Sequence, residues 1–248
     1  MELLSLTDVS KSYGGVKALD RVSFSVAEGE VVGIIGLNGS GKTTAVNVIT
    51  GFTAPDSGAV RFKDKEITGL PPHKIATRGI ARSFQTVRPF HNLPAYKNLI
   101  VPLYSPRIRK FTESGRWGDR DAVALDLLEE VGFERDSHVP YKPASTLPHG
   151  YLRRLELARC LALRPDLLIT DELFSGLSTS EVSSMVPLIE KLQDRGMTLI
   201  MVEHRLRELF RLANRVVVMD RGHKVADGPP AEIVENNTVK ETYLGAEL

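Results

Sequence analysis

The chain has 248 residues with 32 basic and 31 acidic side chains, which gives a formal net charge of +1 at pH 7. This balance supplies no overall field to attract nucleic acid, and no apolar run reaches the roughly 18 residues needed to span a bilayer. Glu2 and the lack of a basic start argue against a signal peptide. The single Cys160 excludes an internal disulfide and, within an apolar helical pattern, is expected in the core.

The first elements in chain order are two strands. Leu3–Tyr13 and Val22–Val26 alternate apolar and polar residues, which predicts half-buried antiparallel strands, and Gly14-Gly15 predicts a turn after the first. Tyr13 stands just before that turn and upstream of the phosphate loop described next. An aromatic ring there can stack on an adenine, although Tyr13 alone is more typical of an ordinary strand aromatic.

A phosphate-binding loop follows the short apolar run Val31–Ile35, which is rich in β-branched residues and predicts a buried parallel strand. The next residues fit G-x-x-x-x-G-K-[ST] at every fixed position and are Gly36, Leu37, Asn38, Gly39, Ser40, Gly41, Lys42 and Thr43, with Thr44 beyond. In such a loop the backbone N–H groups face phosphate oxygens, the lysine reaches the β/γ-phosphates and the hydroxyl binds Mg²⁺. The helix at 45–49 directs its positive dipole at the same anion. The sequence therefore predicts a nucleotide triphosphate site.

Further strands and a helix-rich segment follow the loop. We expect a strand at Ala59–Phe62, a helix at His73–Arg78 closed by Gly79, and a strand at Ile80–Phe84 that leads into Gln85. Between 94 and 147 the strand signal disappears, and Tyr96–Val101 and Asp121–Val131 predict helices. The interval Ser105–Arg120 carries a small basic excess from Arg107, Arg109, Lys110, Arg116 and Arg120 against Glu113 and Asp119, which we interpret as a solvated surface loop rather than a partner-binding face.

The last third of the chain alternates helices and strands. The predicted elements are a helix at His149–Leu163, a buried strand at Asp166–Glu172, a helix at Ser180–Leu192, a strand at Thr198–Val202, a helix at Arg205–Ala213, a hairpin of Val216–Met219 with His223–Ala226, and a helix at Pro230–Glu235. This pattern predicts an α/β fold with a largely parallel sheet.

Polar side chains follow several of the apolar strands directly. Ligands bind outside the carboxyl ends of parallel strands, so Gln85, Asp171, Glu172 and His204 are expected beside the phosphates. Asp171 is placed to hold Mg²⁺ through water, and Gln85 can reach the metal or the attacking water with its amide. Glu172 can activate that water, and His204 can contact the γ-phosphate or orient the water.

These motifs together carry a family resemblance. Tyr13, GLNGSGKT, Gln85, LPHGYLRRLELAR, LLITDE, SGLS and Glu203-His204 occur in the order and spacing of an ABC transporter ATPase subunit. The segments GIARSFQTVRPF, RRLELARCLALRPDLL and ETYLGAEL resemble the ATPases of branched-chain amino acid importers. The resemblance implies one ABC-type nucleotide-binding domain. Its core with an antiparallel β subdomain spans about 1–93 and 165–248, and its helical subdomain spans about 94–164.

The resemblance also implies roles and partners. Two ATP-binding subunits would clamp two ATP molecules, each between one phosphate loop and the other subunit's signature motif. Tyr13 would stack on adenine, Gln85 would sense Mg²⁺, Glu172 would be the general base and His204 the γ-phosphate switch. Polytopic permease subunits would hold the chain at the cytoplasmic face of the inner membrane, and a solute-binding protein would act indirectly.

Two departures from the family pattern bear on mechanism. The signature LSGGQ is replaced by LPHGY, so Pro148 removes a hydroxyl donor, while His149 and Gly150 still begin a helix. Ser178 stands where an acid is usual, and Ser178-x-x-Glu181 predicts a capping box for the next helix. We interpret this as a sign of an asymmetric heterodimer, with a homodimer as the other option.

Other functions remain open at this stage. The ATPases of lipopolysaccharide exporters and urea importers are similar. A soluble ABC ATPase acting on nucleic acid usually carries coiled-coil insertions, zinc motifs or a second cassette, none of which is seen here. A small-molecule kinase would leave the signature-like helix and His204 unexplained.

Overall fold

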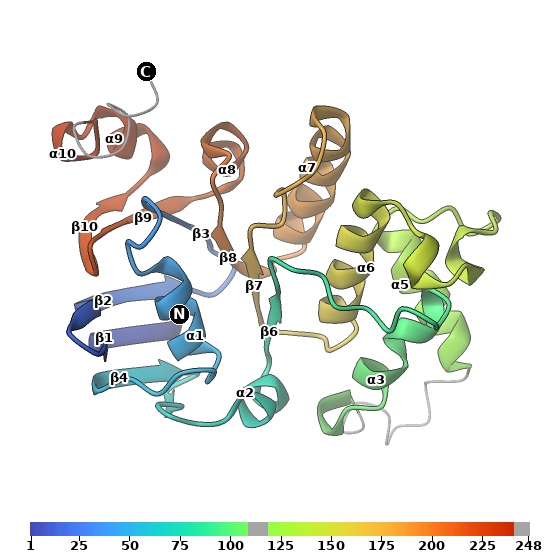
Figure 1. Cartoon of the computed structure of the whole chain (residues 1–248), viewed down its shortest axis with the longest axis horizontal. Helices are drawn as coiled ribbons and strands as arrows, with labels where there is room; N and C mark the ends of the chain where they lie inside the picture. Colours follow the sequence, from blue (N-terminus) through green and yellow to red (C-terminus); the bar gives the residue numbers. More distant parts are fainter. Residues whose placement is uncertain (109–118, 241–248) are drawn as a thin grey trace.

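Two sheets organise the computed structural model, which describes residues 1–108 and 119–240 (Figure 1). The antiparallel sheet has the order β2-β1-β4-β5, from β1 (Glu2–Tyr13), β2 (Val16–Ala27), β4 (Ser57–Phe62) and β5 (Lys65–Glu66). The mixed sheet has the order β10-β9-β3-β8-β7-β6, from β3 (Val31–Ile35), β6 (Ile80–Ser83), β7 (Leu167–Asp171), β8 (Thr198–Val202), β9 (Arg215–Asp220) and β10 (His223–Gly228). Among the described strands of the mixed sheet, only β10 pairs antiparallel, which confirms the predicted hairpin with β9 and an α/β fold with parallel strands.

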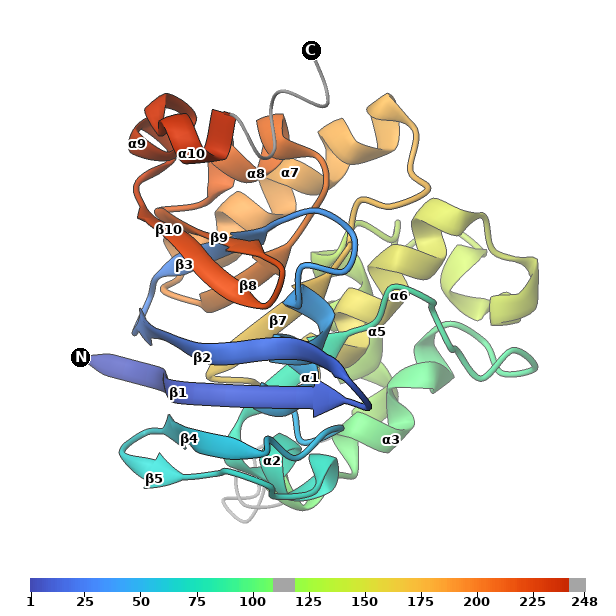
Figure 2. The same ribbon diagram turned by 60° about the vertical axis from the view of Figure 1, so that its left-hand side comes forward.

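The helices divide between the two faces and one end of the mixed sheet (Figures 1 and 2). Helices α3 (Ile100–Leu103), α5 (Arg120–Glu130) and α6 (His149–Leu161) gather at the β6 end. The remaining described helices are α1 (Lys42–Ile49), α2 (Pro72–Arg78), α7 (Thr179–Asp194), α8 (Leu206–Leu212), α9 (Pro230–Glu235), α10 (Asn237–Val239) and the 3₁₀ turns η1 (Tyr96–Leu99), η2 (Val139–Tyr141) and η3 (Ala144–Thr146). No helix in the described ranges is long and apolar enough to cross a membrane.

Alternate residues of the central strands point into two different cores. Val32 and Ile34 of β3 pack with helix α1 and the antiparallel sheet. Val31 and Ile35 pack on the opposite face, in the core that includes residues of α5 to α8. Because side chains alternate along a strand, the short apolar run of β3 can be buried on both faces. Helix α1 is therefore held between the two sheets, directly after the phosphate-binding loop.

Most predicted elements are confirmed, with two informative differences at the start of the chain and in the helical region. Strand β2 begins at Val16 rather than Val22, because register shifts around Val9–Lys11 of β1 interrupt the simple alternation that the sequence offered. The predicted helix at Tyr96–Val101 begins as the 3₁₀ turn η1 before α3.

The interpretation of Ser105–Arg120 as a solvated loop is wrong at its beginning. Residues 106–108 are helical and Ile108 is fully buried. Arg107 donates to the carbonyl oxygen of Arg164 at 2.7 Å and pairs with Asp166 at 2.9 Å. A long side chain that meets carbonyl oxygens and a carboxylate is held against the protein rather than solvated. Arg109, Lys110, Glu113 and Arg116 lie outside the described residues, as does the ETYLGAEL ending.

The predicted capping box at the start of α7 is confirmed. The Ser178 hydroxyl accepts a hydrogen bond from the Glu181 N–H at 3.3 Å, and the Glu181 carboxylate accepts one from the Ser178 N–H at 2.8 Å. These two bonds satisfy donors that the first turn of a helix leaves unpaired. Ser178 thus has a structural role within its own chain.

Candidate functional site

The carboxyl ends of four neighbouring parallel strands meet at one edge of the mixed sheet. Strand β3 pairs with β8, β8 with β7, and β7 with β6, all in parallel. The residues that follow these strands are Gly36, Glu203-His204, Glu172 and Phe84-Gln85. The predicted convergence of polar residues therefore has its structural basis in the register of these strands.

The phosphate-binding loop joins β3 to α1 and packs closely against β2. Gly41 is the N-cap of α1 and has a φ of 106°, which favours glycine. A Cβ atom at Gly41 would lie 2.4 Å from the carbonyl oxygen of Ala18, in β2. The backbone can follow this path only without a side chain, and the path leads directly into the first turn of α1, where free N–H groups favour an anion.

Lys42 lies across the loop with its ammonium group at the carbonyl oxygens of Gly36 (2.6 Å) and Leu37 (3.0 Å). Burial lowers the pKa of Lys42, and the negative charges of Glu172 and Asp171 counteract that effect. The lysine and both acids therefore share one electrostatic environment. The two carbonyl oxygens of the loop hold the ammonium group of Lys42 at the place where phosphate oxygens would bind.

Glu172 is the centre of a cluster of three predicted residues. Its Oε2 accepts a hydrogen bond from the Gln85 amide at 2.6 Å, and its Oε1 lies 3.0 Å from His204 Nε2. Glu172 also has a φ of 53°, an uncommon backbone conformation for a residue with a side chain. Its N–H donates to the carbonyl oxygen of Val202 at 2.8 Å, which holds this strained backbone beside β8. The structure thus places the predicted base, amide and histidine in direct contact.

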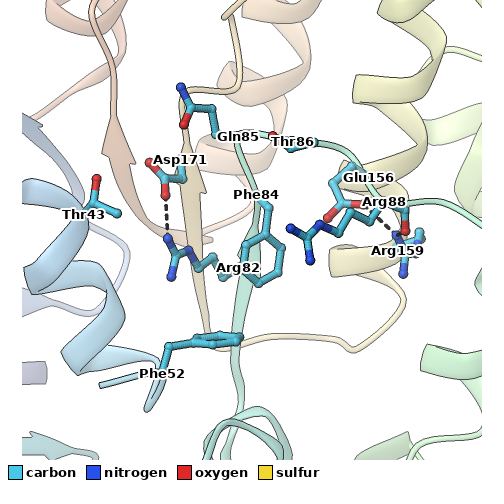
Figure 3. A pocket seen from close by; sticks show the side chains of 10 residues that line it. All are labelled: Thr43, Phe52, Arg82, Phe84, Gln85, Thr86, Arg88, Glu156, Arg159 and Asp171. Atoms are coloured by element: carbon cyan, nitrogen blue, oxygen red, sulfur yellow. Dashed lines mark hydrogen bonds and ion pairs between the residues drawn. The ribbon is translucent and has the colours of Figure 1, made fainter. Parts of the chain in front are cut away.

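The predicted metal ligands line one cavity of about 450 Å³. Thr43, Gln85 and Asp171 all contribute to its wall (Figure 3), so hydroxyl, amide and carboxylate oxygens are available together. No group of three or more His, Cys, Asp or Glu residues that could hold a metal occurs in residues 1–108 and 119–240. Mg²⁺ does not need such a cage, because it takes few protein oxygens and keeps water or phosphate as its remaining ligands. The donor set therefore fits a Mg²⁺–nucleotide site.

The remaining predicted binding residues lie apart from this cluster. Tyr13 ends β1, is half exposed, and its hydroxyl lies 3.3 Å from the Thr53 hydroxyl beyond α1. Pro148 is the N-cap of α6 without a side-chain cap, followed by His149 and Gly150. Among the residues described, the lining of the 450 Å³ cavity includes none of these three signature positions.

The signature glycine faces the capping box of α7. A Cβ atom at Gly150 would lie 2.5 Å from Glu181 Oε1, so a side chain there would displace the end of the Glu181 side chain. The pKa of Glu181 is lowered by hydrogen bonds from the N–H and the hydroxyl of Ser178. His149 and the Gly150 N–H lower it to a smaller extent. An anion therefore already lies near the N-terminal turn of α6 within the same chain.

A row of charged residues on α6 was not predicted as functional. Arg153 donates to the carbonyl oxygens of Phe84 (3.2 Å) and Ser175 (3.1 Å), which precede Gln85 and follow Glu172. Arg159 donates to the Arg88 carbonyl oxygen at 3.0 Å and pairs with Glu156 at 2.8 Å. Arg153, Glu156 and Arg159 share one helix face because they are three residues apart. That spacing of charges in an apolar helix was the only available signal.

Comparison with known proteins supports one family. The model of the ABC transporter family matches residues 19–175. The high-affinity branched-chain amino acid transport ATP-binding protein BraF of Pseudomonas aeruginosa is 37% identical over 252 residues, which cover 98% of both chains. The lipopolysaccharide export system ATP-binding protein LptB of Escherichia coli is 34% identical over 248 residues, covering 100% of this chain and 99% of that protein.

Solved structures agree in fold. The ADP conformation of MJ1267, an ATP-binding cassette of an ABC transporter, superposes with a TM-score of 0.84 at 33% identity and covers 99% of both chains. The dimeric structure of MJ0796, a bacterial ABC transporter cassette, has a TM-score of 0.80 at 25% identity and covers 92% of this chain and 99% of that one. These likenesses extend over the antiparallel sheet, the mixed sheet and the helical part.

Glu203 is a buried acid beside the cluster, and its ionisation predicts how stability depends on pH. Burial raises its pKa from 4.5 to about 8, although the N–H groups of Phe174 and Leu173 counteract part of this effect. Above pH 4.5 the unfolded chain releases this proton while the folded chain retains it until about pH 8. The stability contributed by the protonated group is therefore complete below pH 4.5 and is lost as the pH rises to about 8.

We therefore expect Glu203→Gln to raise the melting temperature at pH 8 and to change it much less at pH 5. Glutamine stays neutral at both values and can still accept the Phe174 N–H. Thermal unfolding followed by circular dichroism measures the melting temperatures of the variant and the unchanged chain at both pH values. Each kcal/mol of added stability should raise the melting temperature by about 2–4 °C. Equal shifts at pH 5 and pH 8 would show that ionisation of Glu203 is not the cause.

Proposed function

The chain belongs to the ABC transporter family as a subunit that binds and hydrolyses ATP, and we propose that it powers the import of branched-chain or related amino acids. The contact of Glu172 with both Gln85 and His204, beside the phosphate loop, is the observation that carries the ATPase mechanism. The similarity to BraF over the whole chain supports the solute class. The similarity to LptB keeps an exporter as the alternative.

Nucleotide binding follows from the loop and its surroundings. The backbone N–H groups of Gly36 to Thr44 surround the phosphates, and Lys42 exchanges the carbonyl oxygens of Gly36 and Leu37 for phosphate oxygens. Tyr13 presents a half-exposed ring for stacking on the adenine. Thr43, Asp171 and Gln85 would hold Mg²⁺, which neutralises charge on the β- and γ-phosphates when bound.

Glu172 acts as the general base in hydrolysis. Its carboxylate takes a proton from water as the water oxygen bonds to the γ-phosphorus, and the bond from that phosphorus to the β–γ bridging oxygen breaks to release ADP and phosphate. The Gln85 amide and the His204 ring each hold one carboxylate oxygen, which fixes the orientation of the base. His204, in contact with this base, would also bind the γ-phosphate, and Lys42 stabilises the developing negative charge.

A second ATP-binding subunit completes each site. Pro148, His149 and Gly150 lie away from this chain's own cavity, which supports a role toward a nucleotide on the partner. Pro148 offers that nucleotide neither an N–H nor a hydroxyl. We infer an asymmetric dimer, in which this chain's own phosphate loop has complete chemistry while its signature motif serves the partner's site weakly.

Membrane permease subunits are the other proposed partners, with a solute-binding protein acting through them. The chain would attach peripherally to them at the cytoplasmic face of the inner membrane. The absence of a membrane-spanning helix in the described ranges is compatible with this arrangement. The overall charge balance favours such protein contacts over nucleic acid.

The central test replaces the proposed base. Glu172→Gln keeps the contacts' geometry but cannot accept the proton, so the rate of phosphate release should fall by about 10²–10⁴-fold while ATP still binds. Glu66→Gln, on the exposed strand β5, serves as a matched control and should leave the rate unchanged. Normal turnover by Glu172→Gln in the assembled complex would overturn the assignment of the base.

The signature motif gives a second expectation. Pro148→Ser restores a hydroxyl at the N-cap of α6, so ATP hydrolysis at the partner's site should increase. Pro148→Ala is the matched control, because it removes the proline ring without adding a hydroxyl. Steady-state ATP hydrolysis is measured in a complex in which Glu172→Gln inactivates this chain's own site, so that the remaining rate comes from the partner's site. An equal increase with alanine would rule out the hydroxyl as the reason.

The solute class is tested in proteoliposomes that contain this chain with its co-purified permease subunits and solute-binding protein. A branched-chain amino acid should stimulate ATP hydrolysis, whereas urea and lipopolysaccharide should not. Stimulation by either of the latter two alone would replace the proposed solute and leave the ATPase assignment intact.

A further inference from the structure

Arg82 is a buried arginine that the ATPase mechanism above does not use. It lies in β6, and its Nη2 atom is 2.6 Å from Oδ2 of Asp171 at the end of β7. Both side chains are only 7% exposed. A charged pair at this depth interacts more strongly than a surface pair, because little water screens it.

The same guanidinium also contacts the helix that follows the phosphate loop. Nη1 of Arg82 donates to Oδ1 of Asn47 at 2.7 Å and to the Thr50 hydroxyl at 3.3 Å. Asn47 lies in α1, which begins with Lys42 and Thr43, and Thr50 is its C-cap. Arg82 therefore joins the helix of the phosphate loop to the strand that carries Asp171.

Two aromatic rings that line the same cavity lie against the Arg82 guanidinium (Figure 3). The guanidinium carbon is 4.9 Å from the centre of the Phe84 ring and 5.7 Å from that of Phe52. The rings meet edge to face with their centres 5.6 Å apart. Such cation–π contacts hold the planar group in one orientation and limit its access to water.

We propose that Arg82 is a positioning residue of the Mg²⁺–nucleotide site, which sets the affinity for Mg²⁺ by holding the Asp171 carboxylate in place. One carboxylate oxygen is occupied by Arg82, which leaves the other for the metal or its water. Since Arg82 is fixed from α1, it also sets the distance between Asp171 and the Thr43 hydroxyl. This inference rests on the proposed role of Asp171 as a metal ligand.

A purely structural ion pair would behave differently. Its loss would lower the stability of the fold, but the folded fraction would bind Mg²⁺ as before. Arg107 provides the matched control, because it also pairs with an aspartate, Asp166, at 2.9 Å and its side chain is 11% exposed. The aspartate partner of Arg107 immediately precedes β7 and that of Arg82 ends β7, and of the two aspartates only Asp171 is a proposed metal ligand.

The experiment measures the binding of a fluorescent ATP analogue to the full chain, with Mg²⁺ titrated and separately in excess EDTA. Arg82→Gln should raise the half-saturating Mg²⁺ concentration by about 10–100-fold, the usual effect of losing a partner that orients a metal ligand. Binding in EDTA should be unchanged. Arg82→Lys, which keeps the charge but lacks the planar fork, should recover part of the loss.

Additional variants separate the possible failures. Asn47→Ala keeps the buried ion pair but removes one hydrogen-bond partner of the guanidinium. It should therefore also raise the half-saturating Mg²⁺ concentration, which keeps the test possible if Arg82→Gln does not fold. Arg107→Gln should lower the melting temperature and leave the Mg²⁺ titration unchanged. Asp171→Asn tests the underlying metal site and should lose the Mg²⁺ dependence of binding.

Three results would decide against the inference. Wild-type Mg²⁺ half-saturation in folded Arg82→Gln and Asn47→Ala, together with an impaired Asp171→Asn, would overturn the role of Arg82 alone. An equal loss in Arg107→Gln would attribute the effect to general destabilisation. Unchanged Mg²⁺ dependence in Asp171→Asn would overturn the proposed metal ligand and the inference with it.

Discussion

The parallel register of four neighbouring strands is the constraint on which the site depends. Strands β3, β8, β7 and β6 run in the same direction, so the chain leaves each of them at the same edge of the sheet. The phosphate loop, Glu172, His204 and Gln85 come from four segments far apart in sequence, and this edge brings them together. The two cores that bury alternate residues of these strands fix the register, since a slip of one residue would exchange the two faces.

Local patterns allowed much of this arrangement to be predicted. The phosphate loop is contiguous, and strand-end residues such as Glu172 and His204 are identified by the apolar runs before them. Arg82, Arg153 and Arg107 were not identified, because their partners are distant in sequence and the chain carries no local sign of the pairing. Arg82 and Asp171, for example, are 89 residues apart. Whether such an arginine is solvated or buried depends on tertiary packing, and single-sequence periodicity does not contain that information.

The two ends of the site differ in how completely they are built within one chain. Around Glu172, Gln85 and His204 of the same chain hold the carboxylate, and β8 holds the strained backbone. At the start of α6 the proline cap offers no donor, and the Glu181 carboxylate lies beside Gly150. A phosphate approaching that helix from a partner subunit would meet the negative charge of this carboxylate. The same glutamate completes the capping box of α7, so its truncation to alanine would cost helix stability.

The arginines of the charged row on α6 donate hydrogen bonds to backbone carbonyl oxygens of the segment that follows β6. Arg153 and Arg159 bond to the carbonyl groups of Phe84 and Arg88, and every amino acid at those positions would supply the same acceptor. The mechanical link between the helical part and Gln85 is therefore insensitive to the identity of the loop side chains. Substitutions of those side chains leave these backbone acceptors in place, so the helix keeps its hydrogen bonds to the loop.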